Sequence, residues 1–185
     1  RTRFIKYSFF FLIIFIYSGS DEKEKNISTL DGDKIELQMM EAYKEGLKEF
    51  ESRDFLLAAK KFNEAELLFP QSDWAPKASL MAAYSFYIDA YYNDSIFQLE
   101  NFIKIYPQHE RISYAHYLLA MSHYSKIVNE KKDIEPLIES KKKFKFVIEK
   151  YPNTDFSLDA KFKLGLIEET LASKEMFITK HYIKK

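Results

Sequence analysis

The sequence contains no cysteine, and this absence excludes disulfide bridges and thiolate metal sites. Glycine and proline are scarce, with four and five residues among 185. Because the hairpin signal Asn-Gly is also missing, an all-β sandwich or barrel is disfavoured. Apolar residues are plentiful, at 46% of the chain with 17% aromatic, so the composition predicts a packed and mainly helical domain.

Charge of one sign is not in excess either. The 28 lysine and arginine residues are balanced by 28 aspartate and glutamate residues. A protein that binds nucleic acid through its phosphates carries a basic surplus, so we expect no nucleic-acid partner.

The apolar run from Phe9 to Tyr17 is about half of the roughly 20 residues that a membrane-spanning helix needs. It follows a basic segment, which is typical of the apolar region of a signal peptide. We therefore predict that residues 1–20 form a signal peptide, with an uncleaved N-terminal anchor as the alternative. The polar residues 21–36 are predicted to form a flexible tether.

Three stretches of the chain align without a gap on an aromatic residue followed by proline. The pairs are Phe69-Pro70, Tyr106-Pro107 and Tyr151-Pro152. Small residues recur eight and thirteen positions after each proline, namely Ala78, Ala115 and Ala160, then Ala83, Ala120 and Gly165. This periodicity indicates stacked helical hairpins that share a continuous core. Proline disfavours the helical conformation in the residue before it, so each second helix should end at the aromatic residue.

The first unit matches the tetratricopeptide consensus in five places. Its Gly46, Ala58, Phe62, Ala65 and Pro70 stand at consensus positions 8, 20, 24, 27 and 32. The other units are degenerate but share its register. The sequence thus predicts an all-α tetratricopeptide-repeat solenoid of stacked helical hairpins over residues 37–185, with repeats at about 37–70, 74–107 and 111–152 and a partial repeat at 155–185.

The third and fourth repeats each lead to a further structural prediction. The third unit has eight extra residues, Asn129 to Pro136, which are polar and predict a longer loop inside the hairpin. In the fourth unit, "KEMFITKHYIKK" is predicted to be the second helix, and it ends at Lys185.

The concave face of such an array is formed by the first helices, and its groove positions are 5, 9 and 12 of each unit. Tyrosine, which combines apolar area with a polar tip, predominates there and suits a peptide with aromatic side chains. The alternative is that these rings fill the interior of the superhelix. The predicted peptide-binding residues are Tyr43, Leu47, Phe50, Leu80, Tyr84, Tyr87, Tyr117, Met121 and Tyr124.

Little in the sequence favours catalysis. His116 and His123 lie seven residues apart on one predicted helix, too far for the paired chelation seen in metal motifs. No glycine-rich phosphate loop or serine nucleophile motif is present. We expect no enzyme activity, no cofactor and no metal. An enzyme with an unrecognised site would depend on these two histidines alone.

Several stretches resemble the BamD family, also called ComL or YfiO, of the outer-membrane β-barrel assembly machinery. They are "AYSFY" at 83–87, "ISYAHYLLAMSHY" at 112–124, "YPNTDFSLDA" at 151–160 and "EMFITKHYIKK" at 175–185. The extra residues of the third unit also fall where the family has an insertion. The resemblance covers about residues 42–185.

The resemblance implies a non-catalytic scaffold on the periplasmic side of the outer membrane. It would bind BamA, other subunits of the machinery and the C-terminal segments of unfolded outer-membrane proteins. The family's lipid-bearing cysteine is absent, because Gly19 stands at the expected position, so no lipidation is expected as written. The family also continues beyond the point that matches Lys185. Another periplasmic tetratricopeptide adaptor, for example in cell-wall synthesis or division, is the alternative function.

Overall fold

The computed structural model describes residues 20–129 and 134–183, with side chains over 32–126 and 134–176. All regular structure in these ranges is α-helical, which confirms the predicted fold class. The helices are α2 (Ser20–Glu51), α3 (Phe55–Leu68), α4 (Ala75–Ile88), α5 (Tyr92–Ile105), α6 (Ile112–Asn129), α7 (Glu135–Lys150) and α8 (Asp155–Ile183).

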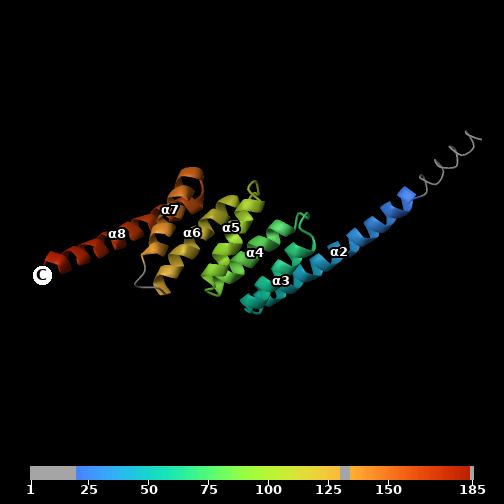
Figure 1. Cartoon of the computed structure of the whole chain (residues 1–185), viewed down its shortest axis with the longest axis horizontal. Coiled ribbons are helices and arrows are strands. Elements are labelled where there is room, and N and C mark those ends of the chain that lie inside the picture. The colour runs from blue at the N-terminus through green and yellow to red at the C-terminus, as the bar shows by residue number, and fades with distance from the viewer. Residues whose placement is uncertain (1–19, 130–133, 184–185) are drawn as a thin grey trace, which may run out of the picture.

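The helices stand in a row from α2 to α8 (Figure 1), and each packs against the helices before and after it in the chain. The first helices of successive hairpins also touch, α4 with α6 and α6 with α8. The molecule therefore has one wall of first helices (α2, α4, α6 and α8) and one wall of second helices (α3, α5 and α7). This is the translational stacking of a solenoid rather than a closed bundle.

The turns of the first two hairpins share one backbone conformation and one hydrogen bond. Arg53 and Ala90 occupy the same repeat position, and both have a positive φ, of 65° and 60°. In each turn the N–H of the following residue donates to the carbonyl oxygen five residues earlier, at 2.9 Å. A left-handed residue other than glycine costs about 1–2 kcal/mol. Its recurrence at one position shows that packing of the two helices determines the turn.

Each hairpin closes around one large residue of its second helix. Phe62, Leu99 and Phe144 stand at repeat position 24, and all three are fully buried. In the first unit the ring of Phe62 lies against Gly46, where an added Cβ would come within 2.8 Å of two ring carbons. The small residue at position 8 is therefore what allows the two helices to approach.

Buried serines reinforce the second and third hairpins. Ser95 Oγ donates to the carbonyl oxygen of Ala83 at 3.0 Å, and Ser140 Oγ donates to that of Ala120 at 3.1 Å. Both serines stand at repeat position 20 and both acceptors at position 8. These bonds satisfy the hydroxyls in the core, where an unpaired polar group would be costly.

The aromatic residue before each repeat proline terminates the second helix, as predicted. Phe69, Tyr106 and Tyr151 are the C-caps of α3, α5 and α7. Proline following them cannot donate a backbone hydrogen bond to continue the helix.

The tether predicted over residues 21–36 is corrected by the structure, because this stretch belongs to α2. The segment contains one glycine and no proline, and its glutamate, lysine and leucine residues are good helix formers. Its polarity suits a helix that projects from the array, as Figure 1 shows for the start of α2.

The predicted signal peptide or anchor, and Gly19 with it, lie outside the described residues. Over the part of the chain that the structure describes, no helix combines the length and apolarity of a membrane span.

The fourth unit is also corrected, since "KEMFITKHYIKK" continues α8 to Ile183 instead of forming a second helix. No glycine or proline interrupts residues 166–183. Ser173 could have capped a new helix, but its Oγ donates to the carbonyl oxygen of Glu169 at 2.9 Å within α8. The helix therefore has no signal that ends it at the hairpin position.

The extra residues of the third unit do not all form a loop. The helix α6 has 18 residues and α7 has 16, whereas α4 and α5 have 14 each. Pro136 lies in the first turn of α7, where a missing N–H has no cost. Of the eight extra residues, Asn129, Glu135 and Pro136 thus belong to the two helices of this hairpin.

Candidate functional site

A cavity of about 540 Å³ opens on the wall of first helices. Its lining comes from four elements of that wall and from the turn between α5 and α6. The lining residues are Tyr43 of α2, Lys77, Leu80, Met81 and Tyr84 of α4, His109, Glu110 and Arg111 of the turn, Ser113 and Tyr114 of α6, and Phe156 of α8.

Three of the nine predicted groove residues line this cavity, namely Tyr43, Leu80 and Tyr84. Leu80 is only 6% exposed, so it forms part of the floor. Tyr84 stacks on Phe50, with ring centroids 5.8 Å apart and planes inclined by 28°. Phe50 therefore supports the wall without lining the cavity.

The remaining predicted residues lie beyond the cavity. Leu47 is 37% exposed on α2, and Tyr87 is half-buried with its hydroxyl 3.3 Å from Ser125 Oγ. Tyr117, Met121 and Tyr124 pack against the core of the third hairpin and α8. For these last three residues, the alternative that the side chains fill the superhelix interior describes their position better than an open groove does.

The hydroxyls of Tyr43 and Tyr114 remain protonated at neutral pH, because the pKa of each is raised. Burial raises the pKa of Tyr43, with partial opposition from the Arg111 charge. Burial, and then repulsion by Tyr84 and Tyr87, raise the pKa of Tyr114 to about 12. The groups therefore act as hydrogen-bond donors and apolar surfaces and not as bases.

Tyr117 locks α6 to α8 beside the cavity. Its hydroxyl donates to Asp159 Oδ2 at 2.6 Å, and its ring stacks on Phe156 with centroids 5.3 Å apart. Burial and this bond to a carboxylate both raise the pKa of Tyr117. Phe156 is thereby held in place as one end of the cavity.

Two cations face the cavity, and their charge is only partly balanced. Lys77 Nζ lies 4.7 Å from the centre of the Trp74 ring, and Arg111 lies in the turn just before α6. Glu110 Oε1 is 4.0 Å from Arg111 Nε, and both side chains are more than two-thirds exposed. Such an exposed pair is weak. The cavity can therefore offer positive charge together with aromatic surface to a ligand.

Several lining residues lie outside the predicted groove positions, although the sequence carries a signal for two of them. Lys77 and Tyr114 both stand at repeat position 2, one helical turn before position 5. Positions three residues apart share a helix face, so the predicted groove positions should have included position 2. His109, Glu110 and Arg111 belong to the connection between hairpins, which repeat periodicity does not describe.

The histidines of α6 lie away from the cavity, against α7. The ring of His116 packs on Phe146 with centroids 4.6 Å apart, and His123 Nε2 is buried with no hydrogen-bond partner among the described residues. No group of three potential metal-ligating side chains occurs in the described ranges.

Acidification from about pH 7.5 to about pH 5 is expected to weaken the third hairpin through His116 and His123. Burial and then the Lys143 charge lower both pKa values, while Glu139 opposes and Lys126 adds to the effect at His123. Because the folded pKa lies below the unfolded value of 6.5, stability present above that value is lost as the pH falls below it. Thermal denaturation of the parent and of a His116→Phe/His123→Leu variant at both pH values measures this.

The double variant should lose less stability on acidification than the parent, whereas a His109→Gln control should behave like the parent. Equal losses for the parent and the double variant would contradict the assignment to these two histidines.

Comparison with known proteins gives a family match over most of the chain. Residues 35–185 match the model of the YfiO family, described as "Outer membrane lipoprotein". The outer membrane protein assembly factor BamD of Rickettsia prowazekii is 33% identical over 94% of this chain and 67% of its own length. The protein of the same name from Caulobacter vibrioides is 32% identical over 69% of this chain and 42% of its own length. The chain therefore spans between two fifths and two thirds of these relatives.

Solved structures support the repeat architecture. The first tetratricopeptide domain of Spaghetti (RPAP3), determined with an HSP90 peptide, superposes with a TM-score of 0.55 at 15% identity. The match covers 74% of this chain and 94% of that domain. At this identity the likeness concerns the fold, which is that of a tetratricopeptide array.

Proposed function

Since this chain belongs to the YfiO family of outer membrane lipoproteins, we propose that it is a non-catalytic scaffold in the assembly of outer-membrane proteins. Its relatives bear the name outer membrane protein assembly factor, and a tetratricopeptide array is a binding fold. The proposed location is the periplasmic face of the outer membrane. The proposed partners are BamA, other subunits of the assembly machinery and unfolded outer-membrane proteins.

The cavity on the first-helix wall supports the binding of a client's C-terminal segment. An aromatic side chain at the end of such a segment would lie between Tyr43, Tyr84 and Tyr114, where aromatic contacts stabilise it. The free carboxylate would face Lys77 and Arg111 and form charge-assisted hydrogen bonds. The coincidence of aromatic walls and two cations in one cavity is the observation that carries this proposal.

An uncovered apolar stripe on α8 supports a second contact, with BamA. Leu158, Phe162 and Leu166 are spaced four residues apart and are 63%, 64% and 36% exposed. Residues at this spacing share one face of a helix. Exposed apolar patches of this kind mark protein interfaces, and this one lies at the end of the array opposite α2.

Replacement of Tyr84 by alanine is expected to weaken the binding of a client C-terminal peptide about tenfold, because aromatic residues at the centre of an interface contribute more than 1 kcal/mol. Tyr87→Ala is the matched control, since Tyr87 lies one turn along α4 but does not line the cavity. Fluorescence anisotropy with a labelled peptide that ends in an aromatic residue and a free carboxylate measures both affinities.

Equal losses for the two variants would remove this cavity from the proposal. If the chain retains neither BamA nor any client C-terminal peptide in a pull-down, the assembly function is wrong and another periplasmic adaptor role takes its place.

A further inference from the structure

The wall of second helices carries its own groove, separate from the cavity described above. A hollow of about 520 Å³ lies between α3 and α5, and a shallower one of about 390 Å³ adjoins it along α3. The two share Asn63 and Leu67, so together they form one elongated groove, called here the α3–α5 groove. The cavity on the first-helix wall has no lining residue in common with it.

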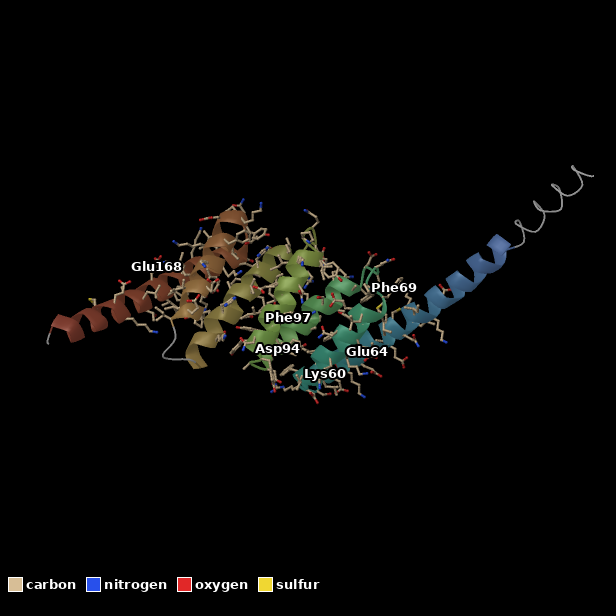
Figure 2. The ribbon with its side chains drawn as sticks, viewed as in Figure 1. Lys60, Glu64, Phe69, Asp94, Phe97 and Glu168 are labelled. Atoms are coloured by element: carbon tan, nitrogen blue, oxygen red, sulfur yellow. The ribbon has the colours of Figure 1, made fainter. Side chains whose placement is uncertain are left out.

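The rims of the α3–α5 groove expose large apolar side chains. Leu67 of α3 is 77% exposed and Ile105 of α5 is 58% exposed. Phe97, which is 65% exposed and marked on α5 in Figure 2, shares the face of Ile105 because residues 97, 101 and 105 are spaced four apart. Large apolar side chains exposed together on one surface mark sites of protein interaction.

The floor of the groove is rich in hydrogen-bond acceptors and carries a carboxylate. Glu66 Oε1 accepts a bond from the Tyr106 hydroxyl at 3.1 Å, and Glu66 Oε2 accepts one from Gln98 Nε2 at 3.2 Å. Asn63 Oδ1 is buried and has no partner among the described residues. The lining contains no lysine or arginine in its deeper part.

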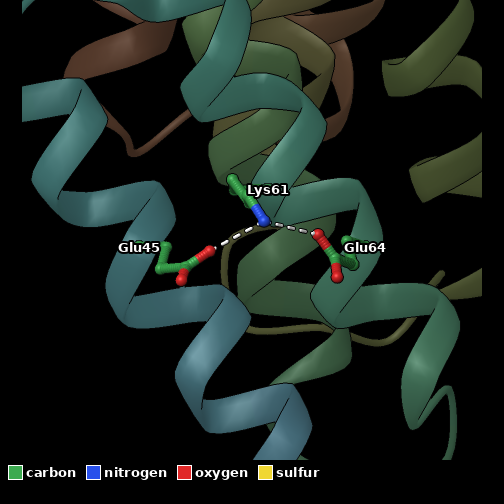
Figure 3. Close-up of polar contacts among 3 residues, drawn as sticks. All are labelled: Glu45, Lys61 and Glu64. Atoms are coloured by element: carbon green, nitrogen blue, oxygen red, sulfur yellow. Dashed lines mark hydrogen bonds and ion pairs between the residues drawn. The ribbon is translucent and has the colours of Figure 1, made fainter.

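The negative charge of Glu66 is not balanced within the described part of the chain. The neighbouring carboxylate, Glu64, already binds Lys61 Nζ at 3.0 Å, and the same nitrogen lies 2.7 Å from Glu45 of α2 (Figure 3). No salt bridge of the described residues involves Glu66, and its hydrogen bonds come from neutral groups. Burial raises the pKa of the Glu66 carboxyl, as expected for a half-buried acid without a cation.

These features indicate which chemical group the α3–α5 groove would bind. A guanidinium group can bind a carboxylate and still donate to a further acceptor, and it keeps its charge when partly buried. Its aliphatic stem suits an apolar rim. The free acceptor of Asn63, the uncompensated Glu66 and the side chains of Leu67 and Ile105 together match an arginine flanked by apolar residues.

We propose that the α3–α5 groove is a second polypeptide-binding site, which takes a segment of a partner protein whose arginine reaches Glu66 and Asn63 while neighbouring apolar side chains contact Leu67, Ile105 and Phe97. This site does not depend on the client-binding function of the first-helix wall. The scaffold thus has two binding faces, one for a terminal carboxylate and aromatic ring and one for an internal basic and apolar segment.

The test uses the whole chain and the amide-capped peptide Ac-Ala-Leu-Arg-Leu-Phe-Ala-NH2, which has no free carboxylate for the other wall. In a nuclear magnetic resonance titration, the peptide should shift the amide signals of Asn63, Gln98 and Tyr106 and leave those of Tyr84 and Arg111 unchanged. Replacing its arginine by citrulline, which is neutral and similar in shape, should weaken binding about tenfold.

Glu66→Gln and its control, Glu100→Gln, separate binding from folding. Glu66→Gln should weaken binding of the arginine peptide about tenfold without loss of thermal stability, because the change removes a half-buried charge. Glu100→Gln is the matched control, since Glu100 lies exposed on α5 outside the groove lining, and it should bind like the parent. Leu67→Ala tests the apolar rim at an exposed position that does not affect the core.

The proposal is wrong if the arginine and citrulline peptides bind equally, if Glu66→Gln binds like Glu100→Gln, or if the shifts map to the first-helix wall. Absence of binding at millimolar peptide also overturns it. Loss of client binding at the other cavity would leave this result unaffected, so the two proposals fail separately.

Discussion

Replacing Gly46 by alanine should destabilise the protein by about 1–3 kcal/mol, the usual cost of overpacking a core. The new Cβ would lie 2.8 Å from Cδ1 and Cε1 of Phe62, a distance at which the ring has to move. Phe62 is fully buried and has the Tyr43 ring 5.3 Å away, so it has little space for movement. Urea denaturation followed by circular dichroism measures the change in the free energy of unfolding.

The same substitution at Gly165 is the matched control, because both glycines stand at repeat position 8. A Cβ at Gly165 would meet nothing within 4 Å, and the residue is exposed on α8. Alanine is the better helix former by about 1 kcal/mol, so Gly165→Ala should stabilise the protein or leave it unchanged. Opposite signs at the two positions are therefore expected.

A second variant tests whether Phe62 is the cause. Adding Phe62→Leu to Gly46→Ala should recover part of the lost stability, and a double-mutant cycle measures the coupling between the two positions. If the two changes are simply additive, or if Gly46→Ala is as stable as the parent, the close approach of these helices is not what requires glycine.

Removing both cations of the first-helix cavity is expected to have the largest effect on binding. A Lys77→Gln/Arg111→Gln variant should bind a client peptide with a free C-terminal carboxylate about 10- to 100-fold more weakly, because hydrogen bonds between charged groups contribute about 1.5–3 kcal/mol. The parent protein should already bind the amidated form of the same peptide weakly. Isothermal titration calorimetry with the acid and amide forms measures this difference.

Lys104→Gln serves as the control for the loss of a positive charge, since Lys104 is exposed on the wall of second helices. Its affinity should match that of the parent, and the preference for the acid form should fall with added salt because salt screens exposed charges. Equal binding of the acid and amide forms by the parent would mean that the cavity recognises side chains alone.

Repeat periodicity predicted the helical hairpins because the residues that define them act locally. Proline after Phe69, Tyr106 and Tyr151 ends a helix in any context, since it lacks an N–H and restricts the residue before it. Small residues facing large ones, such as Gly46 opposite Phe62, are required wherever two helices approach closely. These rules need only the neighbouring residues, and the helices agree with them.

Helix length was harder to predict. The polar residues before 37 and the end of α8 have no strong stop signal, and whether such stretches continue a helix depends on small differences in propensity. The extra residues of the third unit raised the same difficulty, because Asn129, Glu135 and Pro136 belong to the two longer helices that flank them. The order of polar residues in the sequence does not show whether these stretches continue a helix.

By itself, the amino-acid sequence determined the class of fold, the register of the repeats and the wall on which tyrosines gather, since each follows from spacing along one helix. Only the tertiary structure decided which of those tyrosines face a cavity and which pack against the core. It also placed Arg111 of the α5–α6 turn and Lys77 of α4 in the lining of one cavity. Between α3 and α5 it left Glu66 with hydrogen bonds from neutral groups and no salt bridge among the described residues. Such juxtapositions depend on how helices far apart in the chain are stacked, and no local spacing encodes them.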